Sequence, residues 1–176
     1  MGYTHYWYIN PEGDEKKFMK AKREMVKILR KESKLIAGWD GKGRPQLMKA
    51  IPKRGIKVTV GEPDYSISFN GRGDFSHETF MLPSMLADLV DKKKNPWGVQ
   101  KDDDGFVFNF CKTACKPYDI IVTACLVVLK HYMGPDVKVM SDGDLEGMRQ
   151  GMWLAGEILD MEFSNPVAAT EIPEGL

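Results

Sequence analysis

The chain has 176 residues, of which 43% are hydrophobic, so it is long enough to bury the core of one domain without disulfides. Lysine plus arginine and aspartate plus glutamate number 25 each, which excludes a bulk attraction to duplex nucleic acid or to an acidic membrane surface. Three cysteines, an odd number, do not form a disulfide framework. With no signal-peptide pattern and no apolar run of about 20 residues, the sequence predicts a cytoplasmic protein without a membrane span.

The first predicted element is a strand over residues 3–9, where aromatic and β-branched side chains run up to a turn at Asn10. Alternation along this strand places His5 and Trp7 on the face opposite Tyr6.

A long amphipathic helix is predicted over residues 14–39. Asp14 can cap its start, and apolar side chains as far as Ile36 recur at helical spacing. The opposite face is basic, which is typical of a solvated helix surface covering a sheet rather than of an RNA-binding track.

Short strands are expected in the middle of the chain. Residues 55–61 have the composition of a short strand, and residues 65–71 and 76–83 predict a hairpin joined through the loop GRGDF. Residues 84–98 are expected to begin as a helix.

The segment FVFNFC, within residues 105–111, predicts the central strand of the sheet. Residues 117–134 then predict a helix that starts with Pro117 at its first position and is apolar on nearly all sides. Their β-branched content leaves a strand as the alternative. Residues 137–141 predict a further strand, and residues 144–160 a last helix.

The expected fold is therefore one α+β domain over residues 1–165, with a mostly antiparallel or mixed sheet of about five to six strands and three main helices. Residues 166–176 have no apolar period and are expected to form a loosely ordered tail.

The turn between the predicted central strand and the following helix is the first candidate site. A helix N-terminus offers unpaired backbone N–H groups, and Lys112, Thr113 and Lys116 add charge and donors suited to phosphate. Asp119, in the first helical turn, can orient a ligand hydroxyl or act as ordinary helix-end chemistry. Solvated lysines and a capping threonine are the simpler interpretation.

The cysteines carry little chemistry by themselves. Cys111 and Cys115 are spaced CxxxC without a second pair, so no metal site is predicted, and no cofactor motif is present. Cys111 as a nucleophile would require His5 or His77 from elsewhere in the fold. A buried structural cysteine is the more common state.

Further polar residues stand at the ends of predicted strands, where clefts form over sheets. Asn70, His77 and Glu78 surround the predicted hairpin, and Ser141 and Asp142 end a later strand. The candidates for general acid or base are His77, Glu78 and Asp119.

The segments MGYTHYW, FNG, HETF, FCKTACKPYD and SDG resemble a family of uncharacterised bacteriophage and bacterial proteins that begin MGYTHYW and carry an FCKTxxKPYD core motif. The resemblance spans the chain from Met1 to Gly143. It implies a bacteriophage origin and a shared site, without an activity to carry over. The family has a basic residue where this chain has Cys115, which weakens any role for that thiol and removes one cation from the anion site. The site residues that the resemblance implies are His5, Trp7, Asn70, His77, Glu78, Lys112, Thr113, Lys116, Tyr118, Asp119, Ser141 and Asp142.

The leading functional hypothesis is a binding protein for a small phosphate-bearing ligand of the nucleotide type. Tyr6, Trp7 or Tyr118 would stack a base, and Lys112 and Lys116 would take the phosphates. If a bacteriophage encodes the chain, sequestering a nucleotide signal in the host cytoplasm is one use that needs binding alone.

Two other classes stay open. One is a hydrolase or transferase acting on such a ligand. The other is a protein-interaction module that inhibits a host enzyme through exposed apolar surface around Trp39, Trp97 or Trp153. A homo-oligomer is compatible with each of them.

Overall fold

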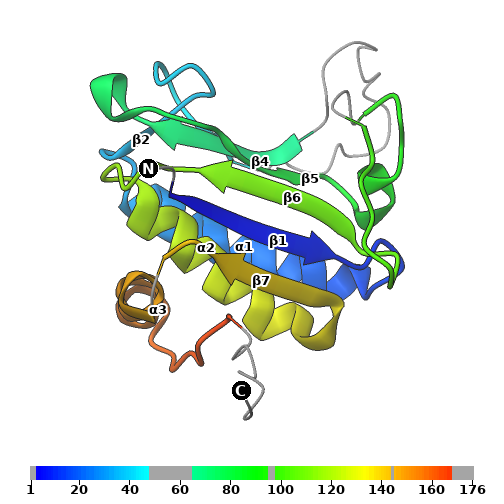
Figure 1. The fold of residues 1–176 in the computed structure, drawn as a ribbon. Helices are drawn as coiled ribbons and strands as arrows, with labels where there is room; N and C mark the ends of the chain where they lie inside the picture. The colour runs from blue at the N-terminus through cyan, green and yellow to red at the C-terminus, as the bar shows by residue number, and fades with distance from the viewer. Residues whose placement is uncertain (1–2, 48–64, 95–97, 144, 168–176) are drawn as a thin grey trace, which may run out of the picture.

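The computed structural model describes residues 3–47, 65–94, 98–143 and 145–167. They form a single α+β body with three helices and two antiparallel sheets, which confirms the predicted fold class (Figure 1). Among the described residues, no helix combines the length and apolar character needed to cross a membrane. The strand expected at 55–61 lies outside the described residues.

The first sheet has three strands in the order β6-β1-β7. β1 (Thr4–Ile9) pairs antiparallel with both β6 (Val107–Lys112) and β7 (Val137–Ser141). The prediction that the FVFNFC strand is central is wrong, because β1 occupies the centre and β6 lies at one edge of this three-stranded sheet. Within this apolar run Phe110 is 52% exposed.

The second sheet is built around β4 (Tyr65–Gly71), which pairs antiparallel with β2 (Ile36–Ala37), β3 (Gln46–Leu47) and β5 (Phe80–Pro83). The predicted hairpin of β4 and β5 is confirmed, although β5 begins only at Phe80. The prediction of Ile36 in the long helix is wrong, because its backbone pairs with Gly71 in β4.

Helix α1 (Glu15–Lys31) begins where Asp14 accepts hydrogen bonds from the N–H groups of Lys16 (2.8 Å) and Lys17 (3.1 Å). It ends eight residues short of the predicted boundary at 39. The helix expected from residue 84 is only a short 3-10 turn, Leu86–Leu89.

Helix α2 (Asp119–Met133) confirms the helical interpretation of its segment, and the strand alternative is wrong. It starts at Asp119, two residues after Pro117. Residues 121–129 are all buried, because α1, α3 and β7 all pack against this helix. Its apolar character on all sides is therefore explained by burial on all sides.

Helix α3 (Leu145–Leu159) is also confirmed and packs against α2. A Cβ atom added at Gly151 would lie 2.5 Å from the Thr123 Oγ1, so a side chain there would push the helices apart. Beyond α3, Val167 forms a parallel bridge with Val139 of β7. The rest of the predicted tail, residues 168–176, lies outside the described residues.

The two faces of the β6-β1-β7 sheet differ. Helices α1 and α2 lie behind β1 and β7 in Figure 1 and cover one face, into which His5, Trp7 and Ile9 are buried. Tyr6 and Tyr8 alternate with them and point to the opposite face, which none of the described helices covers.

Candidate functional site

Four predicted site residues meet at the end of the sheet where β1 begins and β6 and β7 end. We call His5, Thr113, Asp119 and Ser141 the buried polar cluster. The His5 Nε2 lies 2.8 Å from the Asp119 Oδ1, and the His5 Nδ1 lies 2.9 Å from the Ser141 Oγ. The Thr113 hydroxyl donates to the same Asp119 oxygen. The cluster therefore joins β1, β7, the turn after β6 and the start of α2.

The two ring nitrogens of His5 each have one partner in the cluster. In the tautomer that carries its proton on Nε2, His5 donates to Asp119 and its Nδ1 accepts from the Ser141 hydroxyl. The Ser141 oxygen in turn accepts from the N–H of Gly143 at 2.9 Å. His5 is fully buried and Asp119 is 18% exposed. Ser141, His5 and Asp119 thus form a row of hydrogen-bonded side chains in the order hydroxyl, imidazole, carboxylate.

The turn after β6 folds its backbone inward. The N–H groups of Thr113 and Ala114 both donate to the Tyr3 carbonyl, at 3.0 and 3.2 Å. Ala114 and Cys115 adopt left-handed φ values of 51° and 55°, which non-glycine residues rarely do. The strain is held in place by the bonds on both sides of the two residues.

The N-terminus of α2 offers few free donors to an anion. The Asp119 N–H donates to the Lys116 carbonyl (2.8 Å), and the Ile121 N–H donates to the Tyr118 carbonyl (3.0 Å). The Asp119 carboxylate itself sits at the positive end of the helix. The Lys116 Nζ donates to the Asp74 carbonyl at 3.1 Å. Most of the donors in this turn are therefore already bonded to carbonyl groups of the protein itself and are not available to an anion.

A second group of predicted residues ties the two sheets together. The Glu78 Oε2 accepts from the Lys112 N–H at 2.7 Å, and the Tyr118 hydroxyl donates to the Glu78 carbonyl at 2.7 Å. Asn70 is buried, and its side-chain amide makes two hydrogen bonds to the backbone of His77: the Nδ2 donates to the carbonyl and the Oδ1 accepts from the N–H. His77 itself is exposed, and the two hydrogen bonds of the His5 ring go to Asp119 and Ser141 rather than to His77.

Burial limits what two of these side chains can do. Tyr118 is fully buried, so its ring presents no face to a ligand, and burial raises the pKa of its phenol above the ordinary 10.0. Burial likewise raises the pKa of the Cys111 thiol above 9.0. Cys111 therefore stays protonated and is a poor nucleophile.

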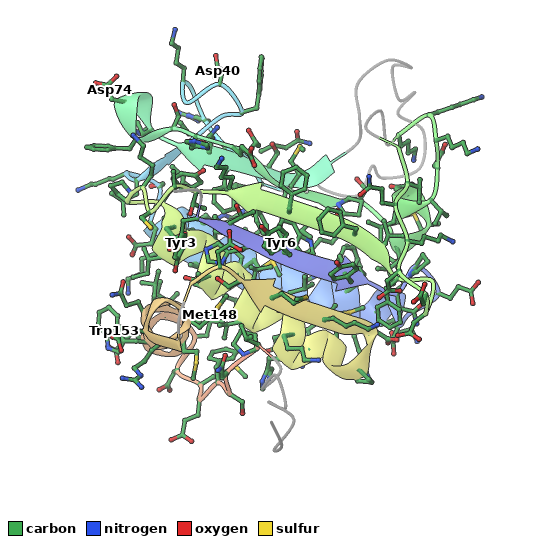
Figure 2. All side chains as sticks on the ribbon, in the orientation of Figure 1. Tyr3, Tyr6, Asp40, Asp74, Met148 and Trp153 are labelled. Carbon is green, nitrogen blue, oxygen red and sulfur yellow. The ribbon has the colours of Figure 1, made fainter. Side chains whose placement is uncertain are left out.

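The uncovered face of the sheet carries a group of aromatic rings. We call Tyr6, Tyr8, Phe108 and Phe110 the open aromatic face. The Phe108 ring centroid lies 5.7 Å from that of Phe110, 5.2 Å from that of Tyr8 and 6.1 Å from that of Tyr6. Figure 2 shows Tyr6 over this face. The rings form one continuous surface across two strands.

The register of the strands extends this surface. Tyr6 lies opposite Phe110 on one side and Met140 on the other, and Met140 is 51% exposed. The Tyr6 hydroxyl donates to Asp142, whose carboxylate also accepts from the Thr4 N–H at 3.1 Å. Asp142 therefore fixes the polar end of the Tyr6 side chain.

A cleft of about 490 Å³ lies between β5 and β6. That volume falls within the usual range for small-molecule sites, about 300–1,000 Å³. Phe108 and Phe110 belong both to the open aromatic face and to the cleft. Its other lining residues include Trp7, Met81, Leu89 and Asn109.

Sequence reasoning missed most of this surface. It selected Tyr6 as a stacking residue but passed over Phe108, Phe110 and Met140. The signal was present as strict alternation in FVFNFC, which puts the phenylalanines on one face and Val107, Asn109 and Cys111 on the other. Of the exposed tryptophans considered, Trp39 and Trp153 are 75% and 62% exposed, and Trp97 lies outside the described residues.

Within the described parts of the chain, no three His, Cys, Asp or Glu side chains gather as a metal site would require. Comparison of the chain with models of protein families, with curated proteins and with solved structures finds no match.

Proposed function

We propose that the protein binds a small nucleotide-type ligand whose base stacks on the open aromatic face. The observation that carries this proposal is the stacked pair of half-buried Phe108 and exposed Phe110, with the Phe108 ring also in contact with Tyr6 and Tyr8. Stacking of one base on an aromatic side chain contributes about 1–3 kcal/mol, and every nucleobase has a face suited to it.

The phosphate group of such a ligand would lie toward Lys112. This residue follows Phe110 on the same face of β6 and pairs with Thr4 at the strand's end. Lys138, on the same face of β7, is already engaged by Asp102 (2.8 Å) and Asp104. Because a long single strand requires a track of free cations, a mononucleotide or dinucleotide fits this face better.

The resemblance to a bacteriophage family gives this proposal a biological use. A protein made in the host cytoplasm that binds a nucleotide signal tightly removes that signal from its receptors. Binding is sufficient for this role.

The proposal is tested by titrating the protein with 5′-mononucleotides and following the melting temperature and the heat of binding. Ligand at about 100 times its dissociation constant adds roughly 2.7 kcal/mol of stability, a shift of several degrees. Phe110→Ala is expected to weaken binding at least about tenfold, since it removes one stacking ring. The matched control is Trp153→Ala, which removes a somewhat more exposed ring that projects from α3, away from Tyr6 (Figure 2). Equal losses in both variants would contradict the proposal.

The position of the phosphate is tested with two lysine variants. Lys112→Ala is expected to weaken nucleotide binding and to leave nucleoside binding unchanged. Lys116→Ala is expected to change neither, because the neighbouring N–H groups that would complete an anion site are bonded within the chain. The reverse result would return the phosphate to the N-terminus of α2.

A second candidate function, hydrolysis or group transfer, is favoured by the chain Ser141–His5–Asp119. A hydroxyl bonded to an imidazole that a carboxylate orients is the arrangement of an activated nucleophile. Ligand recovered after incubation is examined by mass spectrometry for wild type and Ser141→Ala. Conversion by the wild type alone would support the enzyme, and intact ligand from both would support binding.

A further inference from the structure

The wall of the cleft contains a short length of unpaired strand edge. Neighbouring residues of a strand direct their backbone groups to opposite sides. The Phe108 N–H donates to the Gln100 carbonyl (2.8 Å) and the Lys112 N–H donates to the Glu78 Oε2 (2.7 Å), so both residues face away from β1. Phe110 lies midway between them and faces the same way. Within the described part of the chain, its N–H and C=O have no hydrogen-bond partner.

A second unsatisfied group belongs to the same cleft. Trp7 lines it and is 1% exposed, and its buried indole N–H has no hydrogen-bond partner among the residues that the structure describes. A buried donor left unpaired is costly and uncommon in folded proteins. Its ring is held against Phe80, with centroids 5.0 Å apart.

The free backbone pair is too short to recruit a peptide strand. An added strand would need a succession of free groups along β6. Gln100 occupies the position before Phe110, and Glu78 occupies the position after it. One adjacent donor and acceptor remain, which is the complement of a planar heterocycle carrying an acceptor beside a donor.

We propose that the cleft recognises the Watson–Crick edge of the nucleobase. The base accepts from the Phe110 N–H and donates to the Phe110 carbonyl, while the Trp7 N–H donates to a further ring nitrogen or carbonyl oxygen. A base that contacts the rings of Phe108 and Phe110 can turn this edge inward, because both residues line the cleft. The inference rests on the proposed nucleotide binding and adds the part of the ligand that is read.

The test uses pairs of methylated nucleoside 5′-monophosphates, in which one member has lost the N–H of the recognised edge and the other keeps it. 3-Methyluridine has lost the N–H of the recognised edge, whereas 5-methyluridine keeps it and stacks equally well. N6,N6-dimethyladenosine and 2-methyladenosine form the corresponding purine pair. In the pair whose parent base binds, the edge-blocked probe is expected to bind at least about tenfold more weakly, the effect of losing a buried hydrogen-bond pair.

Trp7→Phe tests the third contact, because it removes the indole N–H and keeps an aromatic ring. Nucleotide affinity is expected to fall about tenfold. The melting temperature is expected to fall as well, because the smaller ring leaves a cavity beside Phe80, so binding is measured well below that temperature. Trp153→Phe is the matched control and keeps the wild-type affinity. Equal affinities within each probe pair, or equal affinities of wild type and Trp7→Phe, would overturn the edge recognition but leave the proposed nucleotide binding standing. Absence of binding by every probe overturns the proposed function as well.

Discussion

The buried polar cluster and the open aromatic face are built from the same strands and behave as opposites. His5 and Tyr6 are neighbours in β1, yet one is fully buried and bonded on both sides while the other lies over an uncovered surface. The polar residues of the cluster bind one another, and the apolar residues of the face are left for solvent. In this protein the polar strand ends hold the fold together, and aromatic side chains provide the accessible surface.

The largest contrast is expected between two phenylalanines. Phe80→Ala should lower the free energy of unfolding by about 3–5 kcal/mol, because this ring is fully buried against Trp7 and Phe69. Phe110→Ala should cost less than about 1 kcal/mol, because half of that ring is exposed. Urea unfolding measures both. Similar costs would mean that the open aromatic face is covered in solution.

The cluster itself is tested by Asp119→Ala. The substitution leaves the Thr113 hydroxyl and the His5 Nε2 without an acceptor, and a cost of about 2–4 kcal/mol is expected from two buried groups. Asp103→Ala, in an exposed loop, is the control and should stay within about 0.5 kcal/mol of wild type. A small cost for Asp119→Ala would show that the cluster contributes little to stability and strengthen a catalytic role.

A smaller effect is expected in alkaline solution. Burial raises the pKa of the Cys125 thiol above the ordinary 9.0, so above about pH 9 the unfolded chain releases this proton while the folded chain keeps it. Stability from this thiol is fully present below pH 9 and falls by about 1.4 kcal/mol per pH unit above it.

The measurement is the free energy of unfolding in urea between roughly pH 8 and 10.5, the range over which thiols of the unfolded chain titrate. Cys111 adds a slope of the same sign, so Cys125→Ala should reduce the wild-type slope without abolishing it. The exposed Cys115 supplies the control, because Cys115→Ala should keep the full slope. An unchanged slope in Cys125→Ala would place that thiol in contact with solvent.

The sequence was a good guide to elements whose pattern is local. The alternation of β1, the cap at Asp14 and the apolar length of α2 depend on nearby residues, and each predicted the observed element. Ile36 was misassigned because its apolar side chain fits either period, and only pairing with Gly71 across the fold decides for a strand.

The candidate site was less predictable because it depends on what meets in space. Sequence reasoning selected His5, Thr113, Asp119 and Ser141 separately, as polar groups at strand or helix ends, but could not show that they bond to one another. It also could not place the cleft. This space lies between β5 and β6, and the hydrogen bonds from β6 to Glu78 and to Gln100 bound it along the strand.

The central position of β1 in its sheet limits the insertions and deletions that this strand can accept. Every second side chain of this strand enters the core, and those between them form the outer surface. Inserting or deleting one residue at its start would exchange the two sets, exposing the indole of Trp7 and forcing two tyrosine hydroxyls beneath the helices. A substitution within β1 changes the environment of one side chain, whereas a change of one residue in its length changes the environment of all of them at once.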